Sequence, residues 1–307
     1  MHVSVLYNEL IDSLNIKPDG VYVDCTGGGG GHASLALEKL SENGKLIVLD
    51  RDLEAVNRLN EKFQGDNRVE VIHGNFQELD YILKALGIQK VDGIYADFGV
   101  SSFQLQTAER GFSFRLDGPL DMRMDTSKGE PISAMINNDT ESNIATVIRK
   151  YGEEKFYKNI AKAIVQRRVV KPFETTSDLA DVVKGAIPKK FHKKGINPAT
   201  QTFQAFRIYA NEELSAIDML LSKIGNMLNK GGRFAAISFH SLEDRIVKDA
   251  LNKYAKPCTC PPSFPVCVCN AVAEFKIITK KPIVPTEEEI KKNPLSRSAK
   301  LRVGEKL

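Results

Sequence analysis

Five consecutive glycines, Gly27–Gly31, follow an apolar run that ends in Asp24 and precede a stretch with helical character, Ala33–Leu40. Glycines at a strand-to-helix turn let the backbone approach a ligand closely, and the first amides of the helix then face an anionic group. A second apolar run ends in Asp50, about 20 residues beyond the glycines, where an acid holds a ribose diol in nucleotide-binding folds. The chain is therefore expected to open with a nucleoside-binding site built on a strand, a turn and a helix.

Apolar runs alternate with helical patterns over the first hundred residues and again near the end. Because strands that alternate with helices form a parallel sheet covered on both faces, we predict an α/β fold. The expected strands are Val21–Asp24, Leu46–Asp50, Val69–His73, Val91–Asp97, Arg233–Phe239, Glu274–Thr279 and Lys300–Val303. A helix is expected at Leu214–Leu228, ended by Gly231 and Gly232, and a capping box of Ser241 with Asp244 predicts another that runs to about Tyr254.

The alternation stops between residues 108 and 207, where helical stretches follow one another without a buried strand. A hundred residues is too long for a loop in a compact domain. We therefore expect an inserted, mostly helical second domain at 108–207, within a discontinuous first domain formed by 1–107 and 208–307.

Charge is distributed unevenly along the chain. Residues 1–107 have 9 basic and 16 acidic side chains, a net −7, whereas residues 149–207 have 14 basic and 5 acidic ones, a net +9. A basic segment of this kind indicates a polyanionic substrate, although a solvated lysine-rich surface explains it equally well. No apolar run is long enough to span a membrane and no secretory signal is evident, so we expect a cytoplasmic protein.

Two further acids favour S-adenosylmethionine over a dinucleotide such as NAD. Asp24 precedes the glycines and Asp97 ends the fourth strand, which suits a ligand with a cationic amine beside its carboxylate. The glycine turn would take the carboxylate, Asp50 the ribose diol, and the loop at Asn75 and Phe76 the adenine. Asp97 would then face the methionyl end and the incoming nucleophile. A dinucleotide stays open as an alternative, because it also fits a glycine turn with a distal acid.

Motifs along nearly the whole chain match one family. They are His2–Leu6, Asp24–Thr26 with Gly28–His32, Val91–Ile94 with Asp97, Gly99–Ser102 with Gln104, Glu109–Phe114, Leu120–Asp125, Phe203–Ala205 with Arg207 and Ile208, Ser238–Arg245, and Ser296–Arg302. On these residues the chain resembles the MraW (RsmH) family of bacterial methyltransferases.

The resemblance implies a Rossmann-like class I methyltransferase sheet with an inserted helical domain that recognises substrate. The implied reaction is S-adenosylmethionine-dependent methylation of the N4 exocyclic amine of a cytosine in small-subunit (16S) ribosomal RNA. The expected partner is this RNA, within the small ribosomal subunit, and a homodimer stays open. The implied cofactor residues are Gly30, Gly31, His32, Asp50, Phe76, Asp97 and Gln104.

The N4 amine of cytosine is a poor nucleophile that must be oriented and must lose a proton. Asp97 is our candidate catalytic residue, because a carboxylate that accepts an N–H bond could do both. His240, which follows the fifth strand, is a candidate for substrate contact. Two other functions remain as alternatives: an RNA-binding assembly factor that keeps S-adenosylmethionine as a structural ligand, and an NAD-dependent oxidoreductase. The presence of both Asp50 and Asp97 argues against the assembly factor.

The chain departs from the family pattern at three positions. Phe98 stands where Leu is more frequent, while Asn197 and Gln201 replace a His and a basic residue, which leaves RNA contacts at these two positions open. Four cysteines, Cys258, Cys260, Cys267 and Cys269, frame a proline-rich loop. Because C-x-C pairs are less typical of zinc sites than C-x₂-C, we expect reduced thiols without a metal, in a loop that methyl transfer does not need. A zinc site stays open as an alternative, and a stable disulfide is the least expected state.

Overall fold

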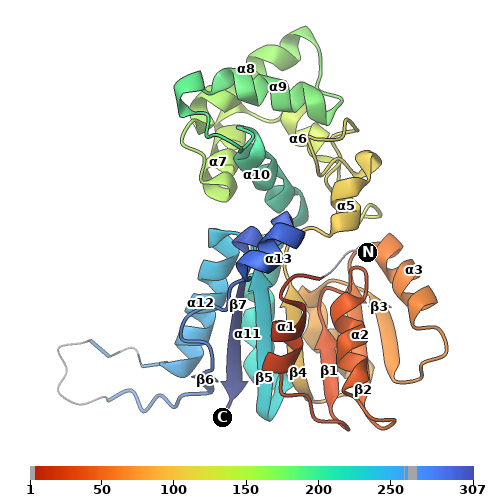
Figure 1. The fold of residues 1–307 in the computed structure, drawn as a ribbon. Helices are drawn as coiled ribbons and strands as arrows, with labels where there is room; N and C mark the ends of the chain where they lie inside the picture. The colour runs from red at the N-terminus through yellow and green to blue at the C-terminus, as the bar shows by residue number, and fades with distance from the viewer. Residues whose placement is uncertain (1–3, 259, 262–267) are drawn as a thin grey trace. The chain divides into compact units, whose positions relative to one another are not determined.

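The computed structural model describes residues 4–258, 260–261 and 268–307, and the chain divides into two compact units (Figure 1). Unit 1 consists of Met1–Gly99 and Leu214–Leu307, and unit 2 is Val100–Glu213. The junctions expected from the sequence, at 107/108 and 207/208, lie inside unit 2 by this division. His2 and Val3 of the family pattern lie outside the described residues.

Unit 1 is built on a seven-stranded sheet with the order β3-β2-β1-β4-β5-β7-β6. The strands are β1 (Val21–Asp24), β2 (Lys45–Asp50), β3 (Val69–His73), β4 (Val91–Asp97), β5 (Leu228–Ser238), β6 (Phe275–Ile277) and β7 (Lys300–Lys306). Neighbouring strands from β3 to β5 pair in parallel, whereas β7 runs antiparallel to both β5 and β6. The predicted Rossmann-like α/β fold is confirmed.

Helices cover both faces of this sheet, because successive side chains of a strand point to opposite sides. Val23 and Ile47 pack against α4, α11 and α12, whereas Tyr22 and Leu46 pack against α1, α2 and α3. The helices of unit 1 are α1 (Tyr7–Ser13), α2 (Gly31–Glu38), α3 (Leu53–Lys62), α4 (Leu79–Ala85), α11 (Glu213–Met227), α12 (Ser241–Ala255) and α13 (Glu287–Lys292), with 3₁₀ turns η1 (Phe76–Glu78) and η4 (Pro294–Ser298). None of the helices in the described ranges is long and apolar enough to cross a membrane.

Unit 2 is helical and has its own apolar core. It contains α5 (Ser102–Gln106), η2 (Ala108–Arg110), α6 (Ile132–Asn138), α7 (Glu141–Gly152), α8 (Tyr157–Val170), α9 (Thr176–Ala186), η3 (Lys189–Phe191) and α10 (Thr200–Asn211). Ile144 and Ile148 of α7 pack with Ile160 and Ile164 of α8, and all four are fully buried. The spacing of four places each pair on one face of its helix, so the two helices share a core.

One helix cap and the role of two glycines differ from the sequence prediction. The predicted capping box of α12, Ser241 with Asp244, is wrong: the N-cap is His240 and its capping partner is Glu243. The helix expected at Leu214–Leu228 is α11, Glu213–Met227, but β5 begins directly at Leu228, so Gly231 and Gly232 do not end the helix. The glycines therefore lie within the strand, beside the irregular pairing of β5 with β4.

Candidate functional site

The turn between β1 and α2 has backbone conformations that favour glycine. Gly28 and Gly30 have φ angles of +51° and +70°, which side chains disfavour. A Cβ on Gly30 would lie 3.0 Å from Leu59 Cδ2 and from Lys62 Cδ. Lys62 Nζ also donates to the Gly30 carbonyl at 2.8 Å. Gly30 is therefore packed against α3 with little room for a side chain, whereas a Cβ on Gly28 would meet only Thr26 O, at 3.8 Å.

The N-terminus of α2 is suited to an anionic group. Gly30 is its N-cap, and no side chain in the described residues caps it. The first backbone hydrogen bond of the helix is donated by the Ser34 N–H to the Gly30 carbonyl, at 3.1 Å. The N–H groups of Gly31 and His32 precede it in the chain. Such amides concentrate partial positive charge at a helix N-terminus. This end of α2 fits the carboxylate of the predicted cofactor.

Asp50 ends β2 with its carboxylate fixed by two backbone amides. Its Oδ2 accepts the Gly28 N–H at 2.7 Å and its Oδ1 accepts the Asp52 N–H at 2.9 Å. Burial raises the pKa of Asp50, although these two hydrogen bonds act in the opposite direction. Each carboxylate oxygen can accept a further hydrogen bond. Asp50 therefore fits two adjacent hydroxyls such as a ribose diol.

Asp24 and Asp97 end the neighbouring strands β1 and β4. Asp24 Oδ1 accepts the Thr26 N–H at 2.9 Å, and burial raises the pKa of Asp24 to about 7. The Asp97 N–H donates to Thr26 Oγ1 at 2.6 Å, whereas Asp97 Oδ1 is buried without a hydrogen-bond partner among the described residues. Burial, together with the charges of Asp24 and Glu243, raises the pKa of Asp97 well above its ordinary value.

The three acids share one edge of the sheet, because β1 lies between β2 and β4 and parallel strands end on the same side. In the part of the chain that the structure describes, no Lys or Arg forms an ion pair with Asp24, Asp50 or Asp97. Buried carboxylates are costly unless they are protonated or meet a cation. The ammonium and sulfonium of S-adenosylmethionine are cations of the required kind, so the residues present fit this cofactor.

The side chain of His32 has a structural role. It is 7% exposed, its Nε2 lies 3.0 Å from the Val5 carbonyl, and its ring stacks on Tyr7 with centroids 6.1 Å apart. Burial lowers the pKa of His32 to about 4, so the neutral ring donates to the carbonyl near neutral pH. The group left for a cofactor is the backbone N–H of His32 at the start of α2.

Phe76 and Gln104 occupy different units. Phe76 begins η1 after β3, and its ring lies 5.7 Å from that of Phe98, which follows Asp97. Gln104 is buried in α5 of unit 2, where its Oε1 accepts the Ser101 N–H at 3.0 Å in a capping box. The structure thus brings the predicted residues of unit 1 to one sheet edge, while Gln104 belongs to the separate helical unit.

Sequence reasoning missed two residues beside Asp97. Thr26 holds the Asp97 backbone; it lies in the family motif Asp24–Thr26, but no role was predicted for it. Glu243 is fully buried in α12, and its Oε2 accepts the Phe239 N–H at 2.7 Å. The Nε2 of His240 lies 3.1 Å from Glu243 Oε1, so the predicted substrate histidine contributes to the start of α12. The sequence signal that could have identified Glu243 is its position three residues after His240, the spacing of a capping box.

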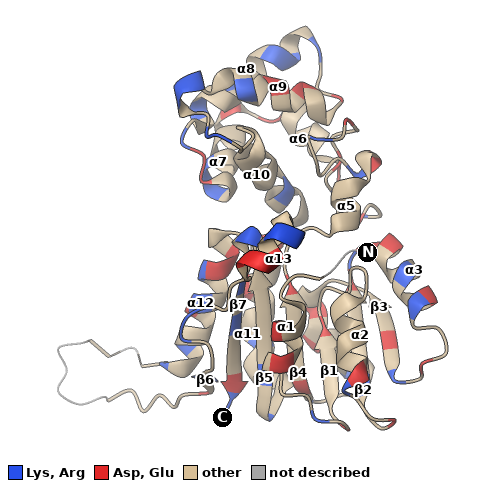
Figure 2. Cartoon of the chain, viewed as in Figure 1, with Lys and Arg blue, Asp and Glu red and all other residues tan. Residues whose placement is uncertain are grey.

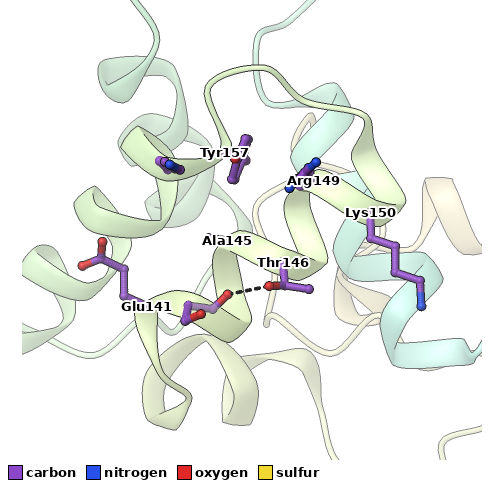
Figure 3. A pocket seen from close by; sticks show the side chains of 8 residues that line it. Glu141, Ala145, Thr146, Arg149, Lys150 and Tyr157 are labelled. Atoms are coloured by element: carbon purple, nitrogen blue, oxygen red, sulfur yellow. Dashed lines mark hydrogen bonds between the residues drawn. The ribbon is translucent and has the colours of Figure 1, made fainter.

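Unit 2 has a pocket of about 770 Å³ lined by α7 and α8 (Figure 3). Its lining residues are Glu141, Ser142, Ala145, Thr146, Arg149, Lys150, Tyr157 and Lys158. Arg149 Cζ lies 5.6 Å and Lys158 Nζ 6.0 Å from the centroid of the Tyr157 ring. Lys and Arg are distributed over both helices (Figure 2). The pocket thus combines an aromatic face with cationic groups, a combination suited to a nucleotide.

Comparison with known proteins identifies the family. A family model described as the MraW methylase family matches residues 1–307. Two relatives, each named Ribosomal RNA small subunit methyltransferase H, come from Clostridium botulinum (strain 657 / Type Ba4) and Clostridioides difficile (strain 630). The chain is 52% identical to the first over 306 residues and 50% identical to the second over 307, covering 100% of this chain and 99% of each relative. These matches confirm the resemblance predicted from the sequence, and with it S-adenosylmethionine as the cofactor: the chain belongs to the MraW methylase family.

Proposed function

We propose that the chain transfers the methyl group of S-adenosylmethionine to the N4 exocyclic amine of a cytosine in small-subunit (16S) ribosomal RNA. The observation that carries this proposal is the buried Asp97 Oδ1, which has no partner among the described residues and lies on the sheet edge of the glycine turn. The names of the relatives support ribosomal RNA as the substrate. The choice of N4 rests on the family resemblance.

The cofactor supplies a methyl group made electrophilic by its attachment to a sulfonium. In the proposed complex, the backbone of Gly30, Gly31 and His32 binds the carboxylate, and Asp50 binds the ribose diol. Phe76 contacts the adenine, and the family resemblance adds Gln104 to the proposed cofactor residues. Asp24 stabilises positive charge from its buried position at the end of β1.

Asp97 is proposed to act on the nucleophile. An ionised carboxylate accepts one N–H of the amine, which orients the nitrogen toward the methyl group, and it takes the proton as the new C–N bond forms. The raised pKa of Asp97 makes it a stronger base than an ordinary aspartate. Because only the ionised form can accept the proton, methyl transfer should increase as the pH rises through this pKa.

Unit 2 is proposed to bind the RNA. Its segment 149–207 has a net charge of +9, whereas residues 1–107 have a net charge of −7, so the acidic part is a poor surface for phosphates. The pocket beside Tyr157 offers a ring on which an unpaired base can stack and cations that can contact phosphates. The target cytosine must itself be unpaired or flipped, since a stacked base keeps its amine out of reach.

Mass spectrometry of small-subunit RNA from cells that lack this protein tests the proposal. We expect one cytosine to lose an N4-methyl group, and expression of the wild-type chain, but not of Asp97→Asn, to restore it. The purified chain should methylate either naked RNA or the isolated subunit, which identifies the true substrate. An unchanged N4-methyl signal in the deletion strain would contradict the proposal.

Calorimetry with each ligand, together with the methyl-transfer assay, distinguishes the proposed function from an oxidoreductase and from an assembly factor. Micromolar binding of NAD without binding of S-adenosylmethionine would favour an oxidoreductase. Binding of S-adenosylmethionine and RNA without methyl transfer to either RNA form would favour an assembly factor.

A further inference from the structure

The two ends of the connection between α12 and β6 lie next to each other. Between Ala255 and Phe275 the described residues form neither helix nor strand. At the base of this connection, Glu274 N–H donates to the Tyr254 carbonyl at 2.9 Å, and the rings of Tyr254 and Phe275 are 4.8 Å apart. Long loops without secondary structure are uncommon in compact domains and are usually functional or fastened in some other way.

Three cysteines converge within this connection. The Sγ atoms of Cys258, Cys260 and Cys269 all lie within 4.8 Å of one another. Cys258 and Cys260 come from the segment that leaves α12, whereas Cys269 comes from the segment that returns to β6. The loop therefore brings together thiols from its two ends. Cys267, the fourth cysteine of the sequence pattern, lies outside the described residues.

We propose that Cys258, Cys260 and Cys269 bind one zinc ion. In a tetrahedral thiolate site with Zn–S distances of about 2.3 Å, sulfur atoms are about 3.8 Å apart, so the observed cluster needs only small side-chain rotations. A disulfide joins sulfurs in pairs at about 2 Å and does not account for three that converge. Thiolates are soft ligands that favour zinc over magnesium or calcium. The unfavourable C-x-C spacing thus matters less than the arrangement that the loop produces.

The proposed zinc ion fastens the loop. It closes a ring of 12 residues from Cys258 to Cys269, adjacent to the contact between α12 and β6. Metal binding adds its free energy to folding, because the unfolded chain lacks the assembled site. We therefore expect zinc to stabilise this corner of unit 1 and to protect the loop from proteases.

Metal content tests the proposal directly. The full chain, expressed in zinc-supplemented medium and purified without chelators, should contain about one zinc per chain by elemental analysis. Cys258→Ser, Cys260→Ser and Cys269→Ser should each lower the zinc content, and protease cleavage of the loop should become faster. Replacement of zinc by Co²⁺ should give the visible absorption bands of a tetrahedral thiolate complex.

Cys25→Ala is the matched control, because Cys25 is a buried cysteine in the other part of unit 1 and should not change the zinc content. Circular dichroism of each variant separates loss of metal from loss of fold. A folded wild-type chain without stoichiometric zinc would overturn the proposal. So would iron as the bound metal, a disulfide between these cysteines in the metal-free native chain, or full zinc in a triple Cys258, Cys260 and Cys269 to Ser variant.

Discussion

The backbone of Asp97 is fixed by a hydrogen bond, while one oxygen of its side-chain carboxyl group has an unused acceptor. Thr26 fixes the backbone at 2.6 Å, while the buried Oδ1 has no hydrogen-bond partner among the described residues. Burial and the charges of Asp24 and Glu243 raise its pKa. A perturbed pKa combined with a vacant acceptor is typical of a group that exchanges a proton during catalysis.

Asp97→Asn is expected to lower the rate of methyl transfer by at least ~100-fold, because an amide cannot take the proton from the amine. Single-turnover kinetics at saturating S-adenosylmethionine measure this rate, and calorimetry measures the cofactor affinity separately. A weaker affinity with an unchanged saturated rate would make Asp97 a binding residue only.

Asp24 should make the cofactor-free protein less stable as the pH rises. Its pKa is raised from 3.8 to about 7 by burial. Because the folded state keeps the proton that the unfolded chain releases, the free energy of unfolding falls between about pH 4 and pH 7. Converting the pKa shift of Asp24 into free energy gives an upper limit of about 4 kcal/mol for this loss of stability.

Asp24→Asn should remove this contribution, and the amide oxygen can still accept the Thr26 N–H. Denaturant unfolding of both proteins should give similar stabilities near pH 4 and a more stable variant at pH 8. The comparison cancels the opposite effect of His32, whose lowered pKa reduces stability as the pH falls from about 6.5 to about 4. Parallel stability curves for the two proteins would contradict the assignment.

At the scale of elements, the sequence predicted strands better than helix starts. β1, β3 and β4 have the predicted bounds, because buried parallel strands are continuous apolar runs flanked by turns. The start of α12 was misplaced, since Ser241 and Asp244 resemble a common capping pair and a histidine N-cap is unusual. The same error hid Glu243 from the list of site residues.

Contacts between distant segments could not be predicted from local pattern. The antiparallel β7 lies between β5 and β6, an order that depends on which strands pair and not on the composition of any one strand. The convergence of Cys258 with Cys269 likewise depends on how the loop returns to β6. The acids at the ends of β1, β2 and β4 were predictable, because parallel strands bring their carboxyl ends to one edge.

The pocket between α7 and α8 gives a prediction about RNA. Tyr157→Ala should weaken binding of single-stranded RNA from the target region by roughly 1–3 kcal/mol, the usual contribution of one stacked base. Tyr157→Phe, the control, keeps the aromatic face and should bind nearly as well as wild type. Fluorescence anisotropy measures both affinities. Equal affinities for the alanine and wild-type proteins would show that RNA does not use this pocket.

At the scale of the whole molecule, positive charge is concentrated in one segment of unit 2. The +9 segment of residues 149–207 lies entirely in unit 2, and its exposed lysines include Lys189, Lys190, Lys193 and Lys194. Neutralising these four lysines should weaken RNA binding and reduce its salt dependence by up to about 0.7–0.9 in slope per lost phosphate contact. Cofactor affinity, measured by calorimetry, should not change.

A second quadruple variant controls for net charge. Lys45, Lys84, Lys90 and Lys230 are exposed lysines of unit 1, and their neutralisation removes the same charge from the molecule. The salt slope of RNA binding should be close to that of wild type in this control. If both quadruple variants have the same slope, the lysines of unit 2 contribute only through total charge.

Because unit 1 is formed by two separate segments of the chain, it cannot finish folding until the end of translation. Residues 100–213 are contiguous, so a nascent chain can complete the core of unit 2 soon after α10 leaves the ribosome. The sheet must wait, because β4 pairs with β5 and β5 pairs with β7, the last strand to be translated. During that interval the apolar strands β1, β2 and β4 lack their final neighbours. A nascent chain stalled before Lys300 should therefore yield a protease-resistant helical fragment and an unprotected N-terminal segment, the part of the molecule most dependent on chaperones.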